Sequence, residues 1–174
     1  MSLLVLAFPA LNKKDYEWIQ SIREKYDDRY YKVVDPHFTI VFPVFDFEES
    51  VFVSHIETLA KDVEPIEFSV QCTTIVKDSF SDYTDIFLVP DKGNSDIIRL
   101  HDRLYMGVLK SELRLNIPFI PHIGIGAATD PVESKRISDK INETRFCIEG
   151  QINTLSVCRY DYPKVEIIKR ISLD

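Results

Sequence analysis

The chain has 174 residues, 45% of them hydrophobic, and a formal net charge of −7. This size and composition predict one globular domain over residues 1–174, with a core that needs neither disulfides nor metals to fold. The acidity argues against binding of long duplex nucleic acid, because phosphate neutralisation needs clustered Lys and Arg, whereas a small nucleotide or an RNA end is compatible with it.

Hydrophobic periodicity predicts four elements in the first half of the chain. They are a buried strand over 3–8, a helix over 13–26 capped by Asn12, an alternating strand over 37–44 that ends or bulges at Pro43, and a helix over 48–63. The last helix is expected to place one apolar side inward, formed by Val51, Phe52, Ile56, Leu59 and Ala60.

The second half is predicted to hold two strands, two helices and a further strand before a closing β region. In order, these are strands over 68–76 and 86–89, a turn over 90–94 that caps a helix over 95–113, a strand over 122–126, a helix from Pro131 to about 144, and strands over 147–173 that turn near 161–163. In the helix over 95–113 we expect Ile97, Leu104 and Val108 to face inward.

The cysteines and the apolar N-terminus indicate the cellular compartment in which the protein is expected. An odd number of cysteines without CxxC spacing predicts no disulfide framework and no zinc site, and we interpret Cys72, Cys147 and Cys158 as core-filling side chains. The apolar start lacks a basic segment and reaches a charge at Lys13, so we expect a buried strand and not a signal peptide. We expect a cytoplasmic monomer without a membrane partner.

A short motif occurs twice in the chain, with a separation of about half its length. Pro36-His37-x-Thr39-Ile40 resembles Pro121-His122-x-Gly124-Ile125, and the two histidines lie 85 residues apart. Each motif follows a strand–helix stretch and precedes another helix, which suggests two similar α+β lobes with one motif strand each.

Strand alternation turns both histidines away from an apolar face. In the first strand the histidine face is predicted to carry His37, Thr39 and Val41, and the core face Phe38, Ile40 and Phe42. In the second strand the histidine face carries His122, Gly124 and Gly126, and the core face Ile123 and Ile125.

Two such histidines suit proton transfer during displacement at phosphorus. One takes a proton from the attacking water or hydroxyl and the other gives one to the leaving oxygen, and histidine does both near its ordinary pKa of about 6.5. The Thr39 hydroxyl can donate to a non-bridging phosphate oxygen. We therefore predict a bell-shaped pH–rate profile with limbs on either side of neutrality, and no requirement for a metal.

The paired motifs resemble the H-x-T/S signature of the two-histidine phosphoesterase superfamily, also called the 2′-5′ RNA ligase family, over almost the whole chain. The resemblance implies a bilobal α/β (α+β) fold, with two pseudo-symmetric lobes of antiparallel sheet, helices outside and a central cleft. It also implies a cyclic phosphodiesterase or 2′-5′ RNA ligase-like enzyme that acts on a 2′,3′-cyclic or 2′-5′ phosphodiester of RNA ends or nucleotides without a cofactor.

The family roles transfer to His37, Thr39 and His122 as catalytic residues. Gly124 departs from the pattern, because the family usually has Thr or Ser there, and the contact of the missing hydroxyl to phosphate must come from a backbone N–H, from a water, or be absent. Gly124 and Gly126 would leave that wall of the cleft open. Because of this departure, we keep an alternative to the enzyme hypothesis: a catalytically weak protein of the same fold that binds a nucleotide or an RNA end.

Other candidates rest on weaker patterns. A phosphate cleft should contain a cation, for which we select Arg159 as a substrate-binding residue, with Lys77 and Tyr160 as weaker candidates. His55 and His101 lie at helical spacing among apolar residues and are interpreted as packing at the edge of the core. Each motif histidine taken alone could be an ordinary strand histidine, and an interaction domain with an empty cleft remains a third hypothesis.

Overall fold

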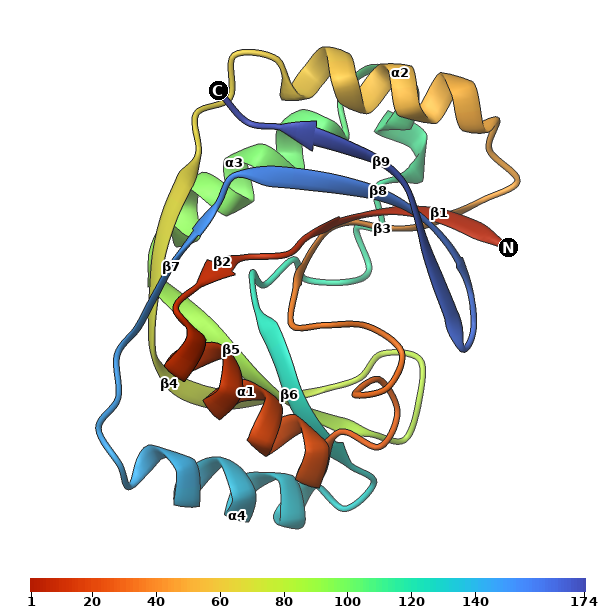
Figure 1. The fold of residues 1–174 in the computed structure, drawn as a ribbon. Coiled ribbons are helices and arrows are strands. Elements are labelled where there is room, and N and C mark those ends of the chain that lie inside the picture. The colour runs from red at the N-terminus through yellow and green to blue at the C-terminus, as the bar shows by residue number, and fades with distance from the viewer.

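Two antiparallel sheets organise residues 1–174 in the computed structural model (Figure 1). The four-stranded sheet has the order β3 (Phe38–Phe45), β1 (Ser2–Ala7), β8 (Thr154–Asp161) and β9 (Lys164–Ser172). The five-stranded sheet has the order β2 (Ala10–Leu11), β7 (Ile148–Ile152), β4 (Ile66–Lys77), β5 (Thr84–Lys92) and β6 (Ile123–Ala128). One motif strand therefore belongs to each sheet, as the sequence predicts.

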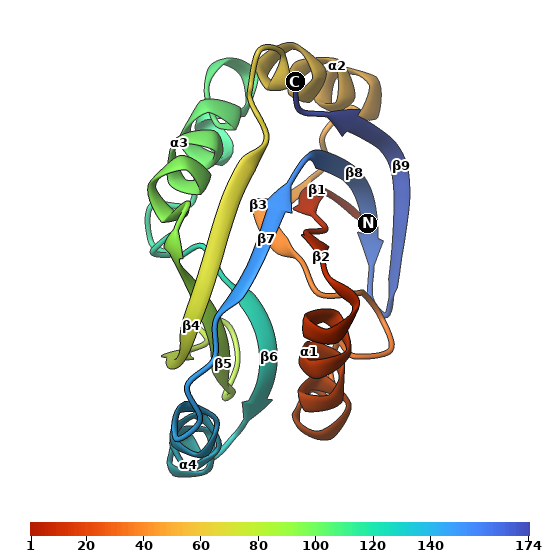
Figure 2. The ribbon, with the colours of Figure 1, turned by 60° about the vertical axis from the view of Figure 1, so that its left-hand side comes forward.

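Four α-helices flank the sheets at the two ends of the molecule. They are α1 (Lys13–Tyr26), α2 (Glu49–Ala60), α3 (Asn94–Leu104) and α4 (Pro131–Asn142), and a 3-10 helix spans Gly107–Glu112. Figure 2 shows α2 and α3 at one end and α1 and α4 at the other. Although α1 lies between two strands of the four-stranded sheet in sequence, it packs against β6 of the other sheet. No helix is long and apolar enough to cross a bilayer.

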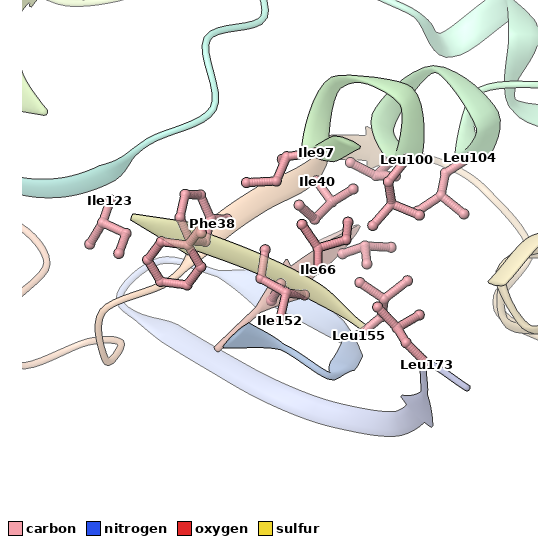
Figure 3. Packing of buried hydrophobic residues seen from close by; sticks show 14 of the residues in the cluster. Phe38, Ile40, Ile66, Ile97, Leu100, Leu104, Ile123, Ile152, Leu155 and Leu173 are labelled. Atoms are coloured by element: carbon pink, nitrogen blue, oxygen red, sulfur yellow. The ribbon is translucent and has the colours of Figure 1, made fainter. Parts of the chain in front are cut away.

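A single large hydrophobic cluster joins the sheets and α3 (Figure 3). Phe38 and Ile40 of β3 contribute to it, together with Ile97 of α3 and Ile152 of β7. The other face of the four-stranded sheet carries a smaller cluster built on Leu4, Leu6 and Cys158. β1 is therefore buried on both faces, which explains its continuous apolar sequence.

Two predicted helices are too long. The helix predicted over 48–63 covers Glu49–Ala60, and Val51 is 44% exposed instead of facing the core. The helix predicted over 95–113 ends at Leu104, because the chain breaks at Gly107, whose φ of +58° lies in the left-handed region. The 3-10 helix that follows buries Leu109 and leaves Val108 exposed.

Two bulges change the face alternation of β3. The pairing moves from Leu3–Val44 to Val5–Val41 and then to Leu6–Thr39, so β3 contains an extra residue at two places. The first irregularity contains Pro43, as predicted, on an edge strand where proline costs no ladder hydrogen bond. The predicted faces beyond Ile40 are wrong: Val41 is fully buried in the core, and Phe42 lines the cleft.

The cysteines are only partly as predicted. Cys158 is buried, but Cys72 and Cys147 are exposed, so two of the three do not fill the core. All three are free thiols, and burial raises the pKa of Cys158 to about 12, which makes this thiol unreactive near neutrality.

Candidate active site

A cleft of about 520 Å³ is lined by residues of both motif strands. His37 and Thr39 come from the four-stranded sheet, and His122 and Gly124 from the five-stranded sheet. Residues 85 positions apart in the sequence thus share one cavity, which is the juxtaposition that the repeated motif predicts.

Both motif histidines make the same backbone contact. The Nδ1 of His37 lies 2.7 Å from the carbonyl oxygen of Asp35, and the Nδ1 of His122 lies 2.6 Å from that of Ile120. Because a carbonyl only accepts, Nδ1 must carry the proton in each ring, and the neutral ring keeps its lone pair on Nε2. Each histidine is therefore prepared to act as a base through Nε2.

Burial governs the charge of both histidines. It lowers the pKa of His37 to about 4 and that of His122 to about 4, against the partial opposition of the carbonyl hydrogen bonds. The charge of His37 lowers the pKa of His122 further, because like charges repel. Both imidazoles are therefore neutral at pH 7 in the free protein. Both limbs of the bell-shaped pH–rate profile are then expected below neutrality, and not on either side of it.

Aromatic rings hold the two imidazoles in position. Phe87 of β5 stacks on His122, with ring centroids 3.5 Å apart and planes inclined by 13°. Phe8 lies beside His37 with centroids 6.0 Å apart. Each ring is thus fixed by one hydrogen bond and by aromatic contact, so little reorganisation is required when a substrate enters.

The two glycines of the second motif strand differ in their surroundings. A Cβ added at Gly124 would meet nothing within 4 Å, so this part of the wall is open as predicted. A Cβ at Gly126 would lie 2.8 Å from the Cβ of Tyr26, at the end of α1. Gly126 therefore allows the close packing of α1 on β6, and the prediction that it opens the cleft is wrong.

Arg159 does not supply the cation of the cleft. Its side chain forms a bidentate pair with Glu49 at 2.6 and 2.7 Å and also contacts Glu166. Alternation along β8 gives Arg159 the parity of Leu155 and Val157, which belong to the main core, so it faces away from the cleft.

Of the two weaker candidates for substrate binding, one lines the cleft and the other does not. Tyr160, on the opposite parity of β8, lines the cleft, and burial with neighbouring Tyr30 raises the pKa of Tyr160 to about 12. The Nζ of Lys77 donates to the carbonyl oxygens of Ser81 and Tyr83 and does not line this cavity.

An arginine that the sequence analysis missed occupies the cleft. Arg29 lies 3.5 Å from both Asp78 and Asp85, and its guanidinium lies over the rings of Tyr83 (4.4 Å) and Tyr30 (4.9 Å). Burial raises the pKa of Asp85 to about 6 despite this partner. Arg29 stands in the irregular segment between α1 and β3, where no periodicity indicates which way a side chain points.

A second arginine is buried at the base of the cleft. Arg23 of α1 is 1% exposed and pairs with Asp27 at 3.1 Å. It also donates to the carbonyl oxygens of Tyr30 and Val34 at 3.1 and 2.8 Å. These bonds tie the segment before His37 to α1. The sequence does indicate the inward position of Arg23, because this residue follows the buried Ile19 by four positions and so lies on the same face of the helix.

The remaining histidines pack as predicted. The Nδ1 of His101 lies 2.8 Å from the carbonyl oxygen of Ile40, and its ring stacks on Phe119. The Nε2 of His55 lies 3.0 Å from the carbonyl oxygen of Leu104. No three His, Cys, Asp or Glu side chains are grouped so that they could hold a metal ion.

Known proteins resemble this chain in both sequence and fold. Residues 11–163 match the model of the 2′-5′ RNA ligase superfamily. A protein of Geobacillus kaustophilus (strain HTA426) named as a phosphoesterase is 27% identical over 124 residues, which cover 70% of this chain and 66% of that protein. The match thus spans slightly less than two thirds of that relative's length.

Solved structures share the fold at low sequence identity. TT0787 of Thermus thermophilus is similar with a TM-score of 0.66 at 14% identity, covering 99% of this chain and 98% of that one. E. coli LigT in complex with 3′-AMP gives a TM-score of 0.59 at 15% identity, covering 99% and 97%. LigT has also been crystallised with NADP+ and with ATP. These likenesses confirm the predicted α+β fold with two antiparallel sheets.

Proposed function

We propose, from the premise that this chain belongs to the 2′-5′ RNA ligase superfamily, that it is a metal-independent phosphoesterase. Its substrate would be a 2′,3′-cyclic or 2′-5′ phosphodiester of a nucleotide or an RNA end. The observation that carries the proposal is the pair of histidines that reach one cleft from separate sheets, each with Nδ1–H bonded to a carbonyl and Nε2 left for proton transfer.

Opening of a 2′,3′-cyclic phosphate by this pair requires one neutral and one protonated ring. The Nε2 of the neutral histidine takes a proton from water as the water oxygen bonds to phosphorus. The bond from phosphorus to one ribose oxygen breaks, and the protonated histidine gives its proton to that oxygen. One water is consumed, a phosphate monoester and a hydroxyl form, and the two rings exchange protonation states.

The surroundings of the histidines support this use. An anionic phosphate between the rings raises their pKa values, because it favours the charged imidazolium. The Thr39 hydroxyl lines the same cavity and can donate to a non-bridging oxygen. Aromatic residues in the lining, among them Tyr30, Phe42 and Tyr160, offer faces for a nucleobase, which is the ligand class seen with LigT.

The direct test compares turnover of 2′,3′-cyclic nucleotides by the wild-type protein, His37→Ala and His122→Ala, with a chelator present throughout. We expect each substitution to lower kcat by about 10²–10⁴, the usual contribution of one acid or base. His55→Gln, which alters a histidine outside the cleft, is the matched control and should retain activity. Equal activity in all four proteins would refute the proposal.

A second candidate function rests on Gly124. This position lacks the hydroxyl that Thr39 supplies in the first motif, so transition-state stabilisation on that side is weaker. The alternative is a protein that binds a nucleotide or an RNA end without turning it over. Measurable binding of 3′-AMP by calorimetry, together with no turnover of any cyclic nucleotide, would favour this function over the first.

A further inference from the structure

A second cavity, of about 440 Å³, adjoins the cleft. The two cavities share seven lining residues, among them the carboxylates Asp78 and Asp85, which pair with Arg29. The other five are Phe42, Pro43, Phe80, Phe87 and His122. Three residues of the segment that leads into β6, Ile117, Pro118 and Ile120, line the second cavity and not the first. The stacked pair of His122 and Phe87 therefore stands at the boundary between the two spaces.

Two cations line only the second cavity, and neither has a carboxylate partner. The guanidinium of Arg114 lies 5.5 Å from the ring of Phe80 and donates at 3.3 Å to the carbonyl oxygen of Pro43. The ammonium of Lys77 donates to two backbone carbonyls. Neither side chain forms a salt bridge, whereas Arg29 and Arg23 of the first cavity are both paired with aspartates.

Two exposed aromatic rings belong to the same cavity. Phe80 is 65% exposed and Phe45 is 57% exposed, and both lie in its lining. Large aromatic faces held in water beside unpaired cations match the two parts of a nucleotide, because a base stacks on the ring and a phosphate pairs with the cation.

We propose that the second cavity is the subsite for a second nucleotide of the substrate. Its base stacks on Phe80 and Phe45, and its phosphate is bound by Arg114 and Lys77. The reacting phosphodiester then lies at the His122 boundary, with one nucleoside in each cavity. This inference rests on the proposed phosphoesterase function and deepens it, since it selects a substrate of at least two nucleotides over a mononucleotide.

The test measures binding of two ligands that lack the hydroxyl able to attack the phosphorus. One is 3′-deoxyadenosine 2′-phosphate, and the other is the 2′-5′-linked dinucleotide of 3′-deoxyadenosine with a terminal 2′-phosphate. We expect the wild-type protein to bind the dinucleotide at least tenfold more tightly by calorimetry. Arg114→Met and Phe45→Ser should each lower this ratio severalfold, because both residues line the second cavity and not the first. Phe45 is 57% exposed, so its replacement should leave the fold intact.

Arg145→Met is the matched control, because Arg145 is an exposed arginine that lines neither cavity, and it should keep the wild-type ratio. A ratio near one in the wild-type protein, or a ratio unchanged in both subsite variants, would overturn the subsite. Turnover of a 2′,3′-cyclic nucleotide is measured separately. A protein with turnover but no preference for the dinucleotide refutes the subsite alone, and one with the preference but no turnover refutes the enzyme alone.

Discussion

At the scale of single residues, the two imidazoles are held alike. Each donates its Nδ1–H to the carbonyl two positions earlier, and each has a pKa near 4 because the surrounding cleft desolvates the charged ring. Catalysis needs the state in which only one of the two rings is protonated. In the free protein this state is most populated near pH 4 and becomes rarer as the pH rises toward 7, since both rings lose their protons.

We therefore expect kcat/KM to fall as the pH rises, by about tenfold per pH unit between pH 5.5 and 7.5. This parameter follows the pKa values of the free protein. The profile of kcat should lie at higher pH, since bound phosphate raises both pKa values. Initial rates on a cyclic nucleotide at saturating and limiting concentrations measure the two. A kcat/KM optimum above pH 7 would contradict the pKa values near 4.

Gly124 supplies a second residue-scale prediction. A serine there has room for its Cβ and places a hydroxyl two residues after His122, as Thr39 stands two residues after His37. If the missing donor limits the rate, Gly124→Ser should raise kcat by up to about 10²–10³, the value of one oxyanion donor. Gly126→Ser is the contrasting variant, because its Cβ would press on Tyr26 and lower the melting temperature. An unchanged kcat in Gly124→Ser would show that no donor is missing.

Much of the candidate site could be predicted from the sequence, because His37, Thr39, His122 and Gly124 sit at fixed offsets in regular strands. The charged groups were not predictable in the same way. Arg29 lies in an irregular segment, and its partners come from another sheet. Arg159 was misplaced because strand parity says which residues share a face but not which of the two faces meets the cleft.

At the scale of elements, α1 packs on β6 of the five-stranded sheet and, through Arg23, holds the segment that leads to β3 of the four-stranded sheet. This side chain is almost inaccessible, and it satisfies Asp27 together with two carbonyls of the segment before His37. Removing the guanidinium leaves a buried carboxylate and two partly buried carbonyls without their partner, and loosens the segment that positions His37.

Arg23→Met should therefore lower the free energy of unfolding by about 3–5 kcal/mol, the usual cost of breaking a buried ion pair. Urea denaturation followed by circular dichroism measures it. Arg136→Met is the control, because Arg136 pairs with Glu133 on the exposed face of α4 and should change stability much less. Equal losses in the two variants would mean that the contacts of Arg23 are not maintained in solution.

Regular elements were predictable where periodicity and capping agree. The bounds of α1 match the prediction, and Asn12 caps it by accepting from the backbone N–H of Asp15. The bulges of β3 were not predictable in number, since their register depends on pairing with β1 and leaves no local pattern. The early end of α3 was missed because its apolar spacing continues beyond Gly107.

At the scale of the whole molecule, the net charge of −7 and the internal pairing of the cleft arginines limit electrostatic attraction for nucleic acid. If Arg114 and Lys77 are the two cations that contact phosphate, affinity for a short single strand should fall with salt with a logarithmic slope of about −1.4. Titrations between about 50 and 200 mM salt would measure it. A slope several times steeper would indicate a larger basic surface than these two residues.

The order of strands in the four-stranded sheet has a consequence for biosynthesis. His37 precedes an edge strand whose only neighbour in the sheet is β1, and β1 is completed on its other side by β8, where Ser2 pairs with Tyr160. β8 (Thr154–Asp161) must therefore have been synthesised before this sheet can close, whereas β4 to β7 of the other sheet follow one another in the sequence and are made earlier. Contacts between residues this far apart in the sequence slow folding, so we expect the complete cleft to form late in the folding of each new molecule.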